Sequence, residues 1–105
     1  MEWIQSKAVR IIVLKPFRLG GIDRVLSIIE RLKKEDVQFV LGGMYECGLS
    51  RYYTALLSRE GNYAGDIPED GFYFKEDIVT GSGTLKNGRL YFKPPEVNQS
   101  LLLAL

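Results

Sequence analysis

Three short segments of the sequence could bind an anion through cationic and hydroxyl side chains. The candidates are Lys15 and Arg18 in the first segment, Ser50 and Arg51 in the second, and Lys86 and Arg89 in the third. Lysine and arginine bind phosphate through charge-assisted hydrogen bonds, and the amides at the start of a helix also favour anions. Such contacts give affinity and position without reading a base sequence. The pattern predicts phosphate binding rather than a reaction.

Each segment also has a purely structural explanation. Lys86 and Arg89 face each other across a predicted turn, where water screens the repulsion between like charges. Arg51 falls in the first turn of a predicted helix, which the helix dipole makes unfavourable for a cation. Either an external anion or an ion pair with Glu46 would compensate for this position. Phe17 could stack on a base or, as we favour, pack under a helix.

The remaining chemistry-bearing residues are carboxylates. Four acids could chelate Mg²⁺ as in a nuclease, although their positions in a loop and at a strand edge favour a solvated rim; they are Glu69, Asp70, Glu76 and Asp77. The sequence has no histidine and a single cysteine, Cys47, so a Cys–His nucleophile pair and a tetrahedral zinc site are excluded. We therefore expect no cofactor, no metal and no enzymatic activity.

Charge is sorted along the sequence rather than mixed. Residues 1–34 carry eight Lys or Arg against three acids, residues 35–77 carry three against nine, and residues 78–105 carry three against one. The net charge of the whole chain is nevertheless only +1. A neutral protein with segregated charge can present one positive face, which attracts an anionic partner at long range.

Length and composition predict one globular domain. The 105 residues are 46% hydrophobic and 26% charged, which is ordinary for such a domain, with tails expected at 1–7 and 96–105. One cysteine cannot form an internal disulfide, so an oxidising compartment is not required. Neither a basic-then-apolar leader nor a membrane-length apolar run is visible. We expect a cytoplasmic protein without membrane association.

The first half of the sequence predicts a strand–helix–strand unit. Residues 8–14 form a largely apolar, β-branched run that Pro16 closes. Apolar residues then recur at helical spacing from Ile22 to Leu32, and Lys33 and Lys34 follow in the last turn. Residues 37–41 are a second short apolar run. So short a return favours a parallel, right-handed crossover.

The second half predicts a helix, a loop and a hairpin. Residues 49–59 fit a helix, which we favour, but part of the segment also alternates like a strand. Residues 61–71 read as a loop, and a β pattern begins at Phe72. Asn87-Gly88 between two apolar segments predicts a two-residue hairpin turn. The predicted fold is α+β, a β-α-β-α-β-β two-layer sandwich with a mixed sheet, helices on one face and a C-terminal hairpin.

This order of elements, together with four short motifs, resembles the Alba superfamily of archaeal chromatin and RNA-binding proteins over about residues 9–93. The motifs are Lys15-Pro16 after the first strand, Val25-Leu26 in the first helix, Leu49-Ser50-Arg51 at the second helix, and the run from Ile78 to Ser82. The resemblance implies a homodimer that contacts a nucleic-acid backbone. Carried over by position, it assigns phosphate contacts to the six cationic and hydroxyl residues named above. The apolar tail, residues 101–105, is costly to leave in water, so we expect it to dock on the chain's own core or, as we favour, on a second subunit.

The function we predict from the sequence is a non-enzymatic module that binds DNA or RNA with little sequence preference. An alternative is a protein-interaction module, of viral or mobile-element type, whose charged blocks dock on a protein partner. A third reading is a carboxylate-metal nuclease. The sequence does not choose between DNA and RNA.

Overall fold

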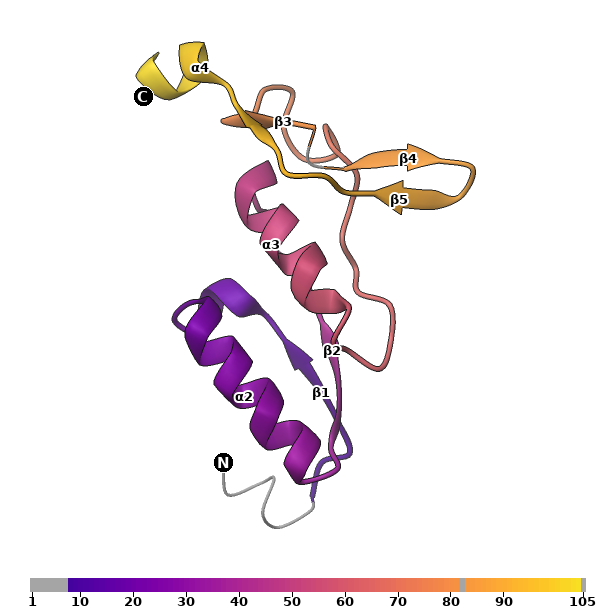
Figure 1. Ribbon diagram of the computed structural model, residues 1–105. Coiled ribbons are helices and arrows are strands. Elements are labelled where there is room, and N and C mark those ends of the chain that lie inside the picture. Colours follow the sequence, from indigo (N-terminus) through magenta and orange to yellow (C-terminus); the bar gives the residue numbers. More distant parts are fainter. Residues whose placement is uncertain (1–7, 82, 105) are drawn as a thin grey trace.

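The computed structural model describes residues 8–81 and 83–104, and its architecture is α+β (Figure 1). In chain order the elements are β1 (Ile11–Leu14), η1 (Pro16–Arg18), α2 (Ile22–Lys34), β2 (Gln38–Leu41), α3 (Gly48–Ser58), β3 (Val79–Thr80), β4 (Thr84–Lys86), β5 (Arg89–Tyr91), β6 (Glu96–Val97) and α4 (Gln99–Ala104). Among the described residues the strands form three separate pairs, β1 with β2, β3 with β6, and β4 with β5. The single mixed sheet of the predicted sandwich is therefore not confirmed.

The strand–helix–strand unit forms as the apolar pattern predicts. β1 and β2 pair in parallel, in a register that sets Ile11 against Gln38 and Leu14 against Leu41. Pro16 ends β1 and begins the short 3-10 helix η1, because proline has no N–H for the ladder. Since both strands run in the same direction, their carboxyl ends lie side by side at the same end of the pair, which we call the carboxyl edge.

The core lies between this strand pair and the helices. Leu14, Phe39 and Leu41 from the strands pack with the apolar stripe of α2, which includes Val25, Ile29 and Leu32, and with Leu57 of α3. The opposite face of β1 is open: Ile11 is 49% exposed and Val13 is 58% exposed. A parallel pair with an uncovered apolar face is unusual, because parallel sheets are normally covered on both sides.

The loop after α3 runs along the outer edge of β2. The backbone N–H of Asn62 donates to the carbonyl of Phe39, and the Asn62 side-chain oxygen accepts the N–H of Phe39, at 2.8 Å and 2.9 Å. Gly65 then lies so close to Leu41 that a Cβ at this position would overlap the Leu41 carbonyl oxygen. The loop thus lies where a third strand would pair with β2, and it brings Asp66 to the carboxyl end of β2.

The C-terminal part is irregular apart from its short strands. The β4–β5 hairpin is confirmed, with Asn87 and Gly88 at positive φ in its turn. The strand predicted from Phe72 was wrong before Val79, because the aromatic rings pack edge-to-face on one another instead, Phe72 on Tyr73 and Tyr73 on Tyr45. Such ring pairs replace the alternation that a ladder would need.

Both ends of the sequence were predicted to be tails. Of the expected tail 96–105, residues 96–104 are described: β6 pairs with β3 and α4 follows, and Leu103 is 83% exposed. The predicted tail 1–7, Ser82 of the fourth motif and Leu105 lie outside the described residues. The division into one domain with two tails stays a prediction. Within the described residues, every helix is too short or too polar to cross a bilayer.

The close approach of Gly65 to Leu41 gives a test of the fold. We expect Gly65→Ala to lower the free energy of unfolding by about 1–3 kcal/mol, because the added methyl must push the loop away from β2. Urea denaturation followed by circular dichroism measures the change. Ala64→Ser, at the exposed neighbouring position, is the matched control and should leave the midpoint within experimental error.

Candidate active site

The carboxyl ends of β1 and β2 bring Lys15 next to a pair of glycines. Lys15 follows Leu14 and keeps the alternation of Ile11 and Val13, so it belongs to the open face of the strand pair. Its ammonium Nζ donates a 2.7 Å hydrogen bond to the carbonyl oxygen of Gly43. Ligands of parallel α/β sheets bind beyond the carboxyl ends of the strands. This edge is therefore the first place to look for chemistry.

Gly42 and Gly43 leave room for the charged groups around them. A Cβ at Gly42 would lie 3.1 Å from Lys15 Nζ, 3.1 Å from Val13 Cγ1 and 3.3 Å from Asp66 Oδ1. A Cβ at Gly43 would lie 3.2 Å from the backbone oxygen of Asp66. Both glycines are buried, so a larger side chain at either would crowd Lys15 or Asp66.

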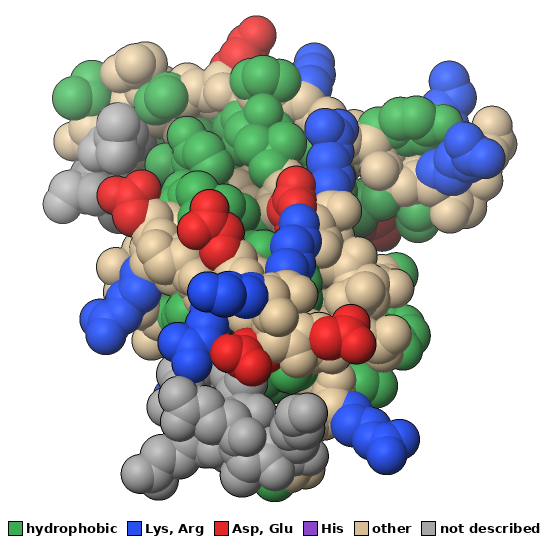
Figure 2. Space-filling view, turned by 60° about the horizontal axis from the view of Figure 1, so that its bottom comes forward, with side chains coloured by type: hydrophobic (Ala, Val, Ile, Leu, Met, Phe, Trp, Pro, Cys, Tyr) green, Lys and Arg blue, Asp and Glu red, His purple; other side chains and the backbone are tan. Residues whose placement is uncertain are grey.

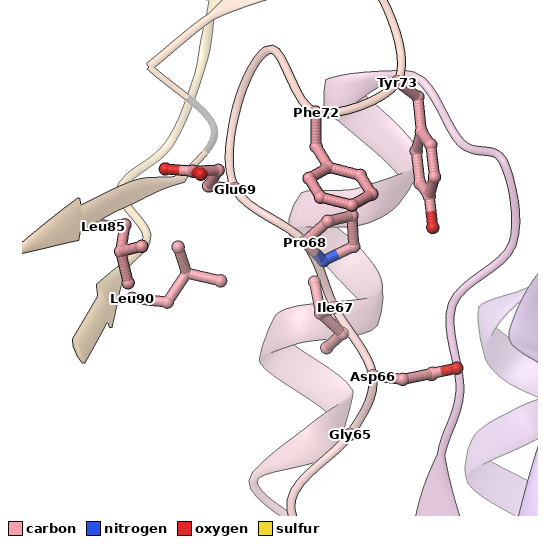
Figure 3. A pocket seen from close by; sticks show the side chains of 9 residues that line it. All are labelled: Gly65, Asp66, Ile67, Pro68, Glu69, Phe72, Tyr73, Leu85 and Leu90. Carbon is pink, nitrogen blue, oxygen red and sulfur yellow. The ribbon is translucent and has the colours of Figure 1, made fainter. Parts of the chain in front are cut away.

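Asp66 reaches this edge from the loop along β2. Its Oδ1 accepts a 2.7 Å hydrogen bond from the N–H of Gly43. In Figure 3 the Asp66 carboxylate points away from an open hollow of about 450 Å³, toward the chain segment that follows β2. The hollow itself is largely apolar; its walls are Ile67, Pro68 and Phe72 from the loop and Leu85 and Leu90 from the hairpin. Asp66 is thus one of the residues that line the hollow, but its carboxylate is directed to the strand end where Lys15 lies.

Glu46 lies buried behind the glycines. It is 7% exposed, and both of its carboxylate oxygens lie 3.3 Å from the hydroxyl of Thr54, which is fully buried. Burial raises the pKa of Glu46, while the Thr54 hydrogen bond and the charges of Arg51 and Lys15 act in the opposite direction. A buried carboxyl with a raised pKa is therefore a neighbour of the Lys15 edge.

Arg51 anchors α3 to the loop that follows Asp66. Its side chain is 2% exposed, and Nη2 donates to Asp70 Oδ1 at 2.8 Å. The Asp70 side chain is 36% exposed. Glu46, the ion partner that the sequence suggested for Arg51, interacts with it through its charge. A guanidinium enclosed in this way has no access to an external phosphate.

The other residues predicted to contact phosphate do not gather with Lys15. Arg18 is exposed on η1, Ser50 donates from its hydroxyl to the carbonyl of Cys47, and Lys86 and Arg89 oppose each other on the projecting β4–β5 hairpin (Figure 1). On the face shown in Figure 2, cationic and acidic side chains are interspersed over most of the surface. On this face, charge that is sorted in sequence is mixed in the folded chain.

The four acids considered for a nuclease are also engaged or dispersed. Asp70 pairs with Arg51, and Asp77 Oδ2 accepts the N–H of Gly48 at 2.7 Å, at the start of α3. Across the described ranges no three acidic, cysteine or histidine residues converge as a metal site would require. Asp77 acts as a helix cap supplied from a distant segment.

The relatives and the solved structures that are similar to this chain agree with one another. The chain is 35% identical over 106 aligned residues to o-succinylbenzoate synthase of Bacillus subtilis, covering 94% of this chain and 29% of that enzyme. It is 30% identical over 87 residues to N-succinylamino acid racemase of Thermus thermophilus, covering 81% and 24%. A crystal structure of an enolase superfamily member from Listeria innocua matches with a TM-score of 0.76 and 32% identity, covering 90% of this chain and 28% of that one. No family model matches the chain.

These relatives point to the enolase superfamily. The resemblance to the Alba superfamily was wrong, and with it the prediction of a non-enzymatic DNA- or RNA-binding homodimer, because the relatives are named as enzymes of small molecules. The protein-interaction and nuclease alternatives find no support in them either. The likeness to Alba arose from a strand–helix–strand–helix order with a lysine after the first strand, which any parallel βα repeat can show. The chain spans less than a third of the length of these relatives.

From the sequence, Lys15 was predicted as a phosphate contact, but the residues around it were not identified. Gly42-Gly43 was read only as the end of a strand, and Asp66 as part of a polar loop. The signal was available, since a parallel crossover places the residues after both strands at one edge. The expectation of no enzymatic activity is also contradicted, because the relatives are named as enzymes. The absence of histidine does not exclude catalysis, since lysine can serve as a base.

The enclosed Arg51–Asp70 pair predicts a large stability effect. We expect Asp70→Ala to lower the free energy of unfolding by about 3 kcal/mol, because the buried guanidinium loses its carboxylate and cannot reach water. Chemical denaturation measures the effect. Glu76→Ala, at an exposed position, is the control, and a loss no larger than the control's would contradict the structural role of the pair.

The raised pKa of Glu46 predicts a pH-dependent stability. Between the ordinary glutamate value of 4.5 and the raised folded value, the native state holds a proton that the unfolded state has released, so stability falls as pH rises through this window. Glu46→Gln removes this titration. The difference in unfolding free energy, variant minus wild type, should therefore increase from pH 4 toward neutrality, as measured by urea titrations at several pH values. A difference that stays flat or decreases would show that the Glu46 pKa is not raised by folding.

Proposed function

We propose that this chain carries one catalytic edge of an enolase-superfamily active site, at which Lys15 transfers a proton to or from carbon next to a substrate carboxylate. The observation that carries this proposal is the position of Lys15 at the carboxyl end of a parallel strand, hydrogen-bonded to Gly43. Enolase-superfamily sites use a lysine or histidine base, and this chain has no histidine.

The geometry of Lys15 suits proton transfer. The side chain is half-buried, and one of its three N–H directions is used by the Gly43 carbonyl. The remaining directions are available to a substrate on the open face of β1. The missing side chain at Gly42 lets the Lys15 ammonium lie close to the backbone, since a Cβ there would stand 3.1 Å from Nζ.

The relatives suggest the kind of carbon acid. Racemisation, the reaction in the name of the Thermus relative, inverts the carbon next to a carboxylate, which proceeds when a base removes that proton and a proton returns to the other face. Four of the relatives carry the name o-succinylbenzoate synthase. We therefore place the substrate among carboxylates that bear a succinyl group.

The enolase-type reaction also uses Mg²⁺ to stabilise the enolate. The described residues do not fit such a site, because Asp66 is engaged with Gly43, Glu46 is enclosed beside Thr54, and no three acids converge. The contribution of this chain is therefore limited to Lys15 and the backbone that holds it.

A chimeric enzyme tests this proposal. The chain replaces the matched segment of the Bacillus subtilis o-succinylbenzoate synthase, and formation of o-succinylbenzoate is followed. We expect the chimera to be active and Lys15→Ala to lower kcat by about 10²- to 10⁴-fold, the usual range for loss of a general base.

The controls separate chemistry from folding. Lys34→Ala changes an exposed lysine at the end of α2 and should leave kcat unchanged. Lys15→Arg keeps the positive charge but not the ability to release a proton, and should also be inactive. A folded chimera whose kcat is insensitive to Lys15→Ala would refute the proposal.

A further inference from the structure

Gly43 connects two charged side chains through its own backbone. Its carbonyl accepts the Lys15 ammonium and its N–H donates to the Asp66 carboxylate, both at 2.7 Å. Neither of these bonds belongs to a helix or a strand ladder. The conformation of the chain just beyond β2 is thus fixed from both sides by residues of other segments.

The two charged groups approach the same point without forming an ion pair with each other. A Cβ at Gly42 would lie within 3.3 Å of both Lys15 Nζ and Asp66 Oδ1. Yet none of the ion pairs found within the described ranges joins them. Both groups instead bind the Gly43 backbone, on the two peptide units that flank its Cα.

We propose that Asp66 is a positioning residue for Lys15. Asp66 Oδ1 holds the Gly43 N–H and so fixes the position of the Gly43 backbone, and the Gly43 carbonyl, in the next peptide unit, accepts the Lys15 ammonium at the end of the strand. The inference rests on the proposed function of Lys15, because a base must be held within hydrogen-bond reach of the proton it transfers. Asp66 itself remains on the loop and contacts Gly43 rather than Lys15.

The position of Asp66 depends on how the loop packs along β2. Asn62 pairs with Phe39 on the edge of β2, and Gly65 passes against Leu41, so Asp66 arrives at Gly43 in a fixed register. Glu69, three residues later, belongs to the same loop, but its side chain lines the hollow instead of contacting Gly43. The chain thus offers a matched acid for comparison.

The experiment uses the full chain and two readouts. Amide hydrogen exchange followed by NMR reports the Gly43 N–H, and the rate of Lys15 acylation by an N-hydroxysuccinimide ester, with Lys34 as internal reference, reports the ammonium head. We expect Asp66→Ala to lower Gly43 protection by about tenfold, the effect of losing a hydrogen bond to a charged acceptor, and to raise Lys15 acylation several-fold. Asp66→Asn, which keeps an acceptor oxygen, should retain most of both values, and Glu69→Ala should change neither.

Each outcome decides the proposal. Loss of Gly43 protection without a change at Lys15 would overturn it, and so would an unchanged Gly43 in Asp66→Ala. If the alanine variant does not fold, Asp66→Ser, whose shorter hydroxyl cannot span the distance to the Gly43 N–H, gives the same two readouts.

The same variants in the chimera keep the two proposals apart. Asp66→Ala should lower kcat less than Lys15→Ala does, and Asp66→Asn should restore much of the loss. If Lys15→Ala abolishes turnover but Asp66→Ala leaves the rate of Lys15 acylation unchanged, only the positioning role of Asp66 is refuted. If Lys15→Ala leaves turnover intact, the proposed function fails whatever Asp66 does.

Discussion

Parallel pairing of β1 with β2 is the constraint on which the candidate site depends. It sets Leu14 opposite Leu41, so the chain leaves both strands at one edge, and Lys15 and Gly42 meet there. An antiparallel pair would have placed them at opposite ends. The α2 crossover makes parallel pairing possible, and its buried stripe against Phe39 and Leu41 keeps the register, since a slip of one residue would turn the apolar side chains outward.

The loop from 61 to 71 extends this constraint beyond the two strands. By pairing Asn62 with Phe39 it covers the edge of β2, and it carries Asp66 to Gly43 and Asp70 to Arg51. A loop with this many fixed contacts is an ordered part of the fold, although its polar composition with Gly65 and Pro68 resembles that of a flexible linker. The site and the anchoring of α3 are therefore built by one segment.

Local patterns in the sequence predicted the helices and the hairpin, but they did not predict which distant segments pack together. The 3.6-residue spacing from Ile22 to Leu32 predicted α2, the helical spacing in 49–57 predicted α3, and Asn87-Gly88 predicted the hairpin, all confirmed. Each of these depends on neighbours in sequence. The single mixed sheet and the strand at Phe72 failed because both depend on which distant segments meet.

The same distinction explains why the charge pattern misled the functional reading. Arg51 stands in a poor position for a cation by helix-dipole reasoning, and the sequence offers an external anion or Glu46 as explanations. The structure supplies a third, Asp70, nineteen residues away on the ordered loop. Lys15 carries the same kind of charge but faces the open side of β1, where the hydrogen bond found for it among the described residues is to a backbone carbonyl. What separates the structural cation from the candidate catalytic one is therefore the segment packed against each, and that segment is set by the edge of β2 rather than by the residues beside either cation.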